Sequence, residues 1–302
     1  MAEVKRSGAD FVKVYSLLSR EAYLGIADEP RRQGIPFAGH VPFSISAAEA
    51  SEAGQRSIEH LMGILLASSS DEAQLRREQV GSSTPVITRF RVEARALNTY
   101  DPAKAAGLFA TFVKHETWQC PTLTMLRSEA YEEDESFRKD PRLAFIPRPM
   151  QERWSRRMFN RGDQGNAIAK RLFQKEVEIT GAMRHAGVSL LAGTDTGNPF
   201  CFPGFSLHDE LVLLVAAGLT PAEALRAATL DPARFLGLNE TLGTVDAGKV
   251  ADLVLLEGNP LEDIKNTQRI DAVIANGHLF ERKALDRMLV EGRAAAEKGP
   301  RR

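Results

Sequence analysis

Short apolar runs alternate with helix-like stretches along the first half of the chain, and this alternation constrains the fold more than any other feature. The runs that read as strands are rich in β-branched or aromatic residues and cover 11–15, 35–41, 57–61, 118–124 and 189–195. The stretches between the first three, 19–34 and 46–54, have helical spacing. Strand and helix alternating at this spacing are typical of βαβ units, which build a parallel sheet. The sequence therefore predicts an α/β fold.

The second half contains clear boundary signals. Thr220-Pro221-Ala222-Glu223 is a capping box with proline at the first helical position, and Asp231-Pro232 predicts the start of another helix. Asn276-Gly277 predicts a tight hairpin turn. Beyond residue 237 the pattern changes to short strands and turns, including 243–245, and then to a helix from about 284 to 298.

We predict two domains from these patterns. Residues 1–237 would form the α/β domain, and it would carry two largely helical, polar insertions at about 63–115 and 126–186. Residues 238–302 would form a small β unit followed by a C-terminal helix.

Composition excludes several classes of protein. The chain has 39 basic and 40 acidic residues, so it lacks the basic excess expected of a nucleic-acid or anionic-membrane partner. Two cysteines far apart in sequence do not make a disulfide scaffold. No apolar run approaches the roughly 20 residues that cross a bilayer, and the first residues lack the apolar core of a signal peptide. We expect a cytoplasmic protein without a nucleic-acid or membrane partner.

Four polar residues stand at or just past the ends of predicted strands: Lys13, His40, His60 and Asp195. In a barrel of parallel strands that edge forms the mouth of the active site. Each residue alone has an ordinary alternative, because a single strand-end histidine is more often structural and Asp195 could simply favour a turn. The combination in this order favours a metal-binding site.

Two further residues are candidates for contact with substrate. Tyr15 lies two residues after Lys13 and so shares its face of the strand, although a packing role is an equal alternative. His115 precedes the fourth predicted strand and could line the pocket.

These motifs resemble the amidohydrolase superfamily, in particular its imidazolonepropionase-like and Xaa-Pro dipeptidase-like branch. The resemblance is carried by 9–14, Gly39-His40-Val41, Ile58-Glu59-His60 and Ala192-Gly193-Thr194-Asp195, and by the later stretches 207–211, 217–225 and 248–255. It implies a TIM-type (β/α) barrel that would lack its first strands, because the family begins with a His-x-His strand and no His-x-His occurs in these 302 residues.

The resemblance also implies roles for the four residues. Lys13 would be carboxylated and would bind metal together with His40 and His60, and Asp195 would bind metal and act as the catalytic acid and base. Without the His-x-His pair, we expect one divalent metal ion per chain, zinc being the expected metal.

The implied activity is metal-dependent hydrolysis of a C–N amide bond in a dipeptide, an N-acyl amino acid or a small cyclic amide. One alternative is a catalytically silent remnant of the family that folds by oligomerisation. Another is an esterase or lactonase that uses the same site. An open sheet of five strands would expose two edges, so we expect a homo-oligomer.

Overall fold

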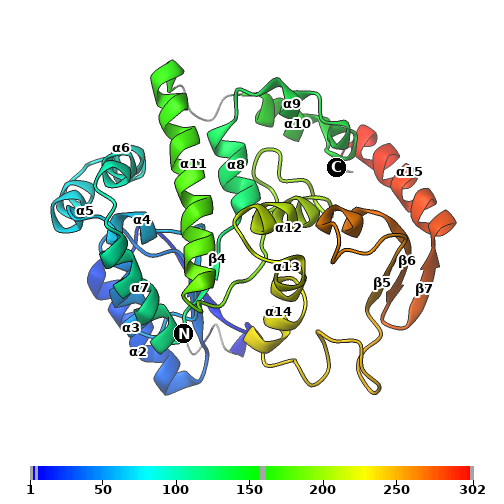
Figure 1. The fold of residues 1–302 in the computed structure, drawn as a ribbon, viewed down its shortest axis with the longest axis horizontal. Coiled ribbons are helices and arrows are strands. Elements are labelled where there is room, and N and C mark those ends of the chain that lie inside the picture. The colour runs from blue at the N-terminus through cyan, green and yellow to red at the C-terminus, as the bar shows by residue number, and fades with distance from the viewer. Residues whose placement is uncertain (1–2, 4–5, 157–160, 300–302) are drawn as a thin grey trace. The chain divides into compact units, whose positions relative to one another are not determined.

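The structure, a computed structural model, describes residue 3, residues 6–156 and residues 161–299 (Figure 1). These residues divide into two compact units. The first unit comprises residues 1–121 and 171–191, and the second comprises residues 122–170 and 192–302. The domain boundary predicted after residue 237 stays a prediction.

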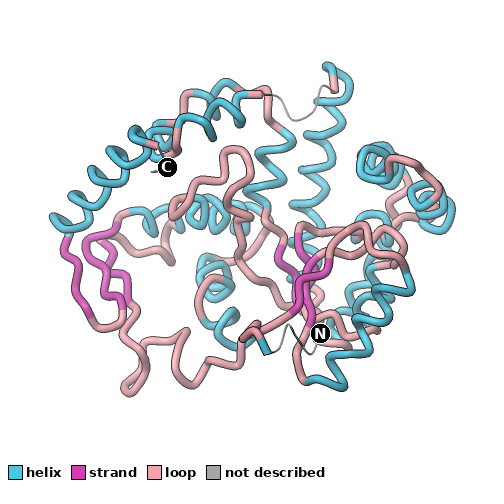
Figure 2. Tube along the Cα trace, turned by 180° about the vertical axis from the view of Figure 1, so that it is seen from behind, coloured by secondary structure: helices cyan, strands magenta, loops and turns pink. Residues whose placement is uncertain are grey.

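A parallel sheet organises the first unit. Its strands, which can be followed in Figure 2, lie in the order of the chain: β1 (Val12–Val14), β2 (Phe37–Gly39), β3 (Ser57–Glu59) and β4 (Trp118–Cys120). Each neighbouring pair is parallel. The predicted α/β class and the first four predicted strands are thereby confirmed.

Helices connect these strands, as expected of βαβ units. The helices of the first unit are α2 (Arg20–Gln33), α3 (Ala47–Glu52), α4 (Ile64–Ala67), α5 (Glu72–Val80), α6 (Pro85–Asn98) and α7 (Pro102–Lys114). Long α11 (Gly162–His185) begins in the second unit and ends in the first. Local sequence explains where α3 begins, because the Ser46 side chain accepts from the backbone of Glu49 and the Glu49 side chain accepts from the backbone of Ser46.

The second unit is built mainly from short helices. They are α8 (Leu123–Ala130), α9 (Glu135–Arg138), the 3-10 helix η1 (Pro141–Phe145), α10 (Arg148–Ser155), α12 (Ser206–Ala216), α13 (Pro221–Ala227), α14 (Leu230–Phe235), η2 (Ile264–Gln268) and α15 (Arg282–Lys298). Part of its core is a cluster of buried large side chains: Phe137, Ile146, Trp154, Phe200 and Phe202.

A small antiparallel sheet also belongs to the second unit. Its strands are β5 (Leu253–Leu256), β6 (Ile270–Ala275) and β7 (His278–Glu281), in that order. The predicted hairpin turn is confirmed, since Asn276 and Gly277 have φ values of 48° and 79°. The C-terminal β unit and the helix that follows it are likewise as predicted.

Two predicted elements differ from the structure. The strand predicted at 189–195 is reduced to a single parallel bridge between Leu190 and Gln119. It ends early because the N–H of Ala192 donates instead to the carbonyl of Ala227, at the end of α13. Residues 243 and 244 form a bend and residue 245 has no regular secondary structure, so 243–245 is not a strand.

One helix begins earlier than predicted. Helix α14 starts at Leu230 with Thr229 as its N-cap, so Asp231 lies inside the first turn. The Asp231 carboxylate accepts from the guanidinium of Arg226 at 3.0 and 3.1 Å, which explains why it does not serve as the cap.

Candidate metal centre

The carboxyl ends of β2 and β3 bring two histidines to one edge of the parallel sheet. His40 directly follows β2 and His60 directly follows β3. Backbone hydrogen bonds hold both residues to the neighbouring strand, since the N–H of His40 donates to Val14 at 3.0 Å and that of His60 to Cys120 at 2.9 Å. The expectation that these histidines lie at the same sheet edge therefore agrees with the structure.

The carboxylate of Glu59 lies beside the two histidines. One ligand atom each from His40, Glu59 and His60 lies within 4.8 Å of the other two. His40 and His60 are buried, with 8% and 5% of their surface exposed. Two imidazoles and a carboxylate at this spacing fit a divalent metal ion such as zinc, which prefers nitrogen and oxygen donors of this kind.

Glu59 was not among the ligands predicted from the sequence, although it lies inside the Ile58-Glu59-His60 motif. Neighbouring side chains of a strand point to opposite faces, so a strand through residue 60 would separate Glu59 from His60. The backbone does not continue as a strand. His60 and Leu61 have left-handed φ values of 58° and 51°. This turn brings the side chains of Glu59 and His60 to the same cluster.

Lys13 lies beside the cluster. Its Nζ is 2.8 Å from Oε2 of Glu59, and its side chain is 48% exposed. The lysine therefore contacts the centre as a cation paired with a carboxylate, whereas the family resemblance implies a carboxylated lysine. The ammonium and carboxylated forms of Lys13 differ in charge.

The electrostatics of the cluster keep His60 uncharged. Burial, and after it the positive charges of Lys13 and Arg89, lower the pKa of His60 from 6.5 to about 4. Neutral imidazole is the form that binds metal, so His60 is ready to coordinate at neutral pH without first losing a proton.

Glycine is required immediately before His40. Gly39 has a φ of 125°, a conformation that residues with a side chain rarely adopt. A Cβ at this position would lie 2.4 Å from the backbone oxygen of Val14. The close approach of β1 and β2 therefore depends on the glycine of the Gly39-His40 motif.

Asp195 belongs to the second unit, in the turn that follows Leu191. Its backbone is left-handed, with a φ of 49°. The side-chain amide of Asn198 donates to Oδ2 of Asp195 at 2.7 Å. A left-handed aspartate held by a local hydrogen bond fits a turn, and the predicted catalytic role of Asp195 stays a prediction.

The two substrate-contact candidates lie in different places within the first unit. Tyr15 is 60% exposed, and its ring stacks on that of His40, with ring centroids 4.1 Å apart and an interplanar angle of 27°. His115 is the exposed C-cap of α7, just before β4. Because the strands are parallel, the start of β4 lies at the opposite edge from His40 and His60. The structure thus brings Tyr15 to the cluster and does not bring His115 there.

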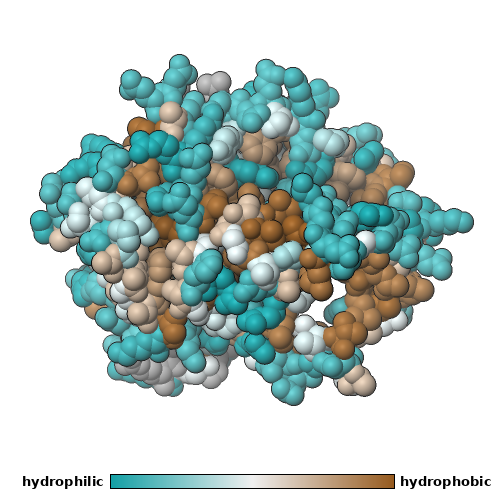
Figure 3. Space-filling model, viewed as in Figure 1, coloured by the Kyte–Doolittle hydropathy of each residue, from teal (hydrophilic) through white to brown (hydrophobic). Residues whose placement is uncertain are grey.

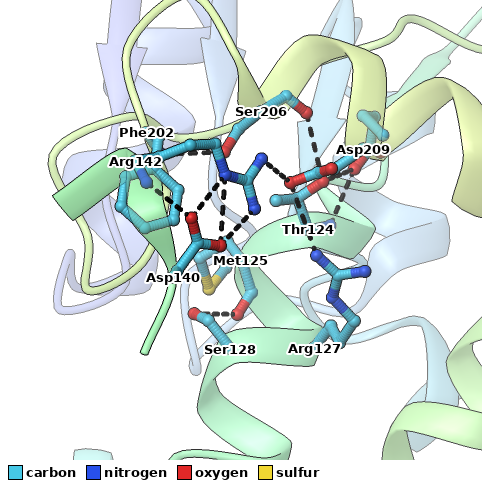
Figure 4. A network of polar contacts seen from close by, with 10 residues as sticks. Thr124, Met125, Arg127, Ser128, Asp140, Arg142, Phe202, Ser206 and Asp209 are labelled. Atoms are coloured by element: carbon cyan, nitrogen blue, oxygen red, sulfur yellow. Dashed lines mark hydrogen bonds and ion pairs between the residues drawn. The ribbon is translucent and has the colours of Figure 1, made fainter. Parts of the chain in front are cut away.

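Asp209, which lies in the sequence motif at 207–211, belongs to a polar cluster in the second unit. The Asp209 carboxylate accepts from Arg142 at 2.7 Å and lies 3.5 Å from Arg127 (Figure 4). Asp140 pairs with Arg142, whose guanidinium lies 4.5 Å from the ring centroid of Phe202 (Figure 4). These contacts tie η1 to α12, so Asp209 has a structural role.

Glu210, the next residue of this motif, is fully buried and caps α8. Its two carboxylate oxygens accept from the backbone N–H groups of Leu123 and Thr124 at 3.0 and 2.7 Å, and from the Thr124 hydroxyl at 2.9 Å. The side chain of Thr122, the N-cap residue of α8, makes no capping hydrogen bond to the helix. A carboxylate from another helix therefore satisfies the first N–H groups of α8.

Comparison with known proteins identifies the class. A model of the amidohydrolase family matches residues 18–280. The chain belongs to the amidohydrolase family, a family of hydrolytic enzymes, and the predicted membership is confirmed.

Individual relatives match shorter segments. Ochratoxinase of Aspergillus niger is 42% identical over 101 residues, which are 32% of this chain and 20% of the relative. N-acetylglucosamine-6-phosphate deacetylase of Rattus norvegicus is 34% identical over 109 residues, 36% of this chain and 23% of the relative. Imidazolonepropionase of Pseudomonas savastanoi pv. phaseolicola is 43% identical over 76 residues, 24% of this chain and 18% of the relative.

Solved structures share the fold. Bottromycin amidohydrolase superposes with a TM-score of 0.70 at 24% identity, over 97% of this chain and 60% of that one. A Xaa-Pro dipeptidase with bound methionine gives a TM-score of 0.60 at 20% identity, over 93% and 56%. The chain therefore spans well under two thirds of these relatives.

Proposed function

We propose that this protein is a metal-dependent hydrolase of amide bonds in small substrates. The observation that carries the proposal is the convergence of His40, Glu59 and His60 at the carboxyl edge of a parallel sheet, in a chain of the amidohydrolase family. That edge is where enzymes built on (β/α) barrels carry their active sites.

The proposed metal is zinc or a similar divalent ion, held by His40, His60 and a carboxylate. When bound, such an ion lowers the pKa of a coordinated water toward neutrality and polarises the substrate carbonyl. Both histidines are buried, and His60 is held in its neutral state. Three protein ligands are the usual number in catalytic zinc sites, which keep one position open for water or substrate.

The source of the carboxylate is a distinct part of the proposal. In the unmodified form, the Lys13 ammonium neutralises Glu59, and Glu59 supplies the oxygen donor. In the carboxylated form that the family resemblance implies, the lysine itself becomes an anionic ligand and no longer neutralises Glu59. We propose that Lys13 is carboxylated in the active enzyme.

Asp195 is the proposed acid and base, on the strength of its Gly193-Thr194-Asp195 motif alone. An aspartate can take a proton from the attacking water and pass it to the leaving amine. Tyr15 is the proposed contact with substrate, because its exposed ring covers one face of His40.

The names of the relatives support amides as the substrate class. A deacetylase, a Xaa-Pro dipeptidase and an amidohydrolase stand among them. We propose a dipeptide, an N-acyl amino acid or a small cyclic amide as the substrate. Esters and lactones differ only in the leaving group, so they belong in the same substrate panel.

The test is turnover of that panel by protein incubated with zinc. We expect amide hydrolysis by the wild type and its loss in His40→Ala and His60→Ala, together with the metal. Asp195→Asn keeps the shape of the side chain but cannot accept a proton, so it should lose turnover with a smaller loss of metal. A protein that binds zinc and hydrolyses nothing in the panel would favour a silent member of the family, and one that hydrolyses only esters would favour an esterase.

A further inference from the structure

The side chain of Asn198 holds the carboxylate of Asp195 from within the same loop of the second unit. Its amide nitrogen lies 3.0 Å from the backbone oxygen of Asp195 and 2.7 Å from Oδ2 of the Asp195 side chain. A backbone carbonyl can only accept, so the amide N–H group of Asn198 is the donor, and the same nitrogen faces the carboxylate. Asn198 therefore ties one oxygen of the carboxylate to the backbone of Asp195.

Asn198 is also the first residue of a turn whose conformation is unfavourable. The N–H of Cys201 donates to the carbonyl of Asn198 at 3.1 Å, which closes the turn around Pro199 and Phe200. Proline at the second position and a positive φ at the third are typical of a type II turn, in which the third position favours glycine. Phe200 occupies that position with a φ of 60°. A bulky residue keeps this conformation only where its surroundings hold it.

A buried aromatic cluster holds Phe200, of which only 5% is exposed. Its ring stacks on that of Phe137, with centroids 5.1 Å apart and an interplanar angle of 25°, and lies 5.8 Å from the ring of Trp154. Phe137 belongs to α9 and Trp154 to α10, so two helices far away in sequence hold the loop. Glycine would suit the backbone better but would lose these contacts. The turn is therefore anchored by its aromatic side chain.

We propose that Asn198 is a positioning residue for Asp195, and that Phe200 anchors the turn from which Asn198 acts. This inference rests on the proposed role of Asp195 as the acid and base. A carboxylate that takes a proton from water and passes it to the leaving amine must keep one orientation, and a small displacement slows such a step. The contacts that run from the aromatic cluster through Phe200 and Asn198 hold the carboxylate in place.

The first test compares leaving groups. Asn198→Ala should lower turnover of an alkyl amide from the substrate panel about 10- to 100-fold, the usual effect of losing a hydrogen bond to a charged group, with unchanged zinc content. Turnover of a nitrophenyl ester with the same acyl group should fall less, because nitrophenolate leaves without a proton. The control is Asn259→Ala. The Asn259 side chain also donates to a nearby carboxylate, that of Glu262 at 3.1 Å, and its loss should leave both turnovers unchanged.

The second test needs no activity. Phe200→Ala and Phe200→Gly both remove the ring, but only glycine relieves the backbone at a positive φ. Both should speed hydrogen exchange of the Cys201 amide, which closes the turn, by about 10-fold. Phe200→Leu keeps most of the buried volume and should show a smaller change in the same direction. The control is Phe112→Leu, a fully buried position of the first unit, which should lower stability without changing this amide.

Equal losses on the amide and the ester, or full amide turnover in Asn198→Ala, would overturn the role of Asn198. A Cys201 amide that exchanges as slowly in Phe200→Gly as in the wild type would overturn the anchoring by Phe200. A wild type that binds zinc and hydrolyses neither substrate is a different result. It would contradict the proposed function and with it the role of Asn198, whereas the exchange of the Cys201 amide would still test the anchoring.

Discussion

Glu210 shows how one buried carboxylate can make stability depend on pH. Burial is the largest effect on its pKa and raises it from 4.5 to about 7, against the opposing effect of the hydrogen bonds from Leu123 and Thr124. A raised pKa means that the folded protein holds the proton more tightly than the unfolded chain. The resulting stabilisation is fully present below about pH 4.5 and is lost as the pH rises through about 7.

We predict that Glu210→Gln makes the free energy of unfolding depend less on pH between pH 4.5 and pH 7. Glutamine has the same shape but does not titrate, so the difference in unfolding free energy between wild type and variant should change between pH 4.5 and pH 7. Glutamine also has one oxygen instead of two, so one N–H of α8 loses its acceptor at a cost of about 1–3 kcal/mol. Urea unfolding at several pH values measures both effects. A difference in unfolding free energy that stays constant across this pH range would mean that Glu210 is not the group that titrates.

The role of Glu59 can be separated from that of Lys13 by metal affinity. Because the proposed ligand is a carboxylated Lys13, Lys13→Ala should lose most of the zinc affinity, whereas Glu59→Gln should bind zinc nearly as the wild type does. Glu52→Gln, at an exposed position of α3, is the control and should bind as the wild type does. Strongly lowered affinity in Glu59→Gln would instead assign the ligand to Glu59, because the amide is a weaker donor without charge.

At the scale of elements, the contact between β1 and β2 depends on one glycine. We predict that Gly39→Ala destabilises the protein by about 1–3 kcal/mol or more, because the new methyl group would overlap the backbone of Val14 and the φ of 125° is strained for alanine. Gly25→Ala is the control. Gly25 lies in α2 with nothing within 4 Å of an added Cβ, so alanine should raise stability by up to about 1 kcal/mol.

Thermal or urea unfolding of both variants checks this prediction. Equal stability of Gly39→Ala and wild type would mean that β1 and β2 can separate at little cost. In that case the position of His40 would not depend on the pairing of β1 with β2.

Local signals in the sequence predicted the elements whose form is decided locally. The capping box at Thr220, the hairpin at Asn276-Gly277 and the first four strands were confirmed. The shortened strand at 189–195 was not predictable, because the N–H of Ala192 finds its acceptor in a helix some 35 residues away.

The site also has a part that was predictable and a part that was not. The positions of His40 and His60 were predictable, because both residues follow strands and parallel strands end at one edge of the sheet. The part played by Glu59 was missed because it depends on the left-handed backbone of His60, a conformation that histidine adopts only occasionally and that no sequence pattern signalled.

At the scale of the whole molecule, the small sheet of the second unit offers a surface for association. Val254, Leu255 and Leu279 are exposed by 55%, 44% and 57%, and Figure 3 shows hydrophobic surface in this region. Strands β5 and β7 each pair on one side only within the described residues. Exposed apolar strands with open edges favour association.

We therefore predict that the protein is a dimer or a higher oligomer at micromolar concentration. Leu279→Glu should shift light scattering toward the monomer, because a charge cannot be buried in such an interface without cost. Ile87→Glu, an exposed position of α6 in the first unit, is the control and should leave the mass unchanged. A monodisperse wild-type monomer in light scattering would contradict the predicted association.

The described residues contain no helix long and apolar enough to cross a membrane, which agrees with the absence of an apolar run in the sequence. We propose that His40, His60 and a neighbouring carboxylate form one metal site per chain.

This site can be tested by the metal stoichiometry of the purified protein, measured by elemental analysis after incubation with zinc and removal of the excess. We expect about one zinc ion per chain, and near-complete loss in the double variant His40→Ala/His60→Ala. No retained zinc, two ions per chain at full occupancy, or one ion that persists in the double variant would contradict it.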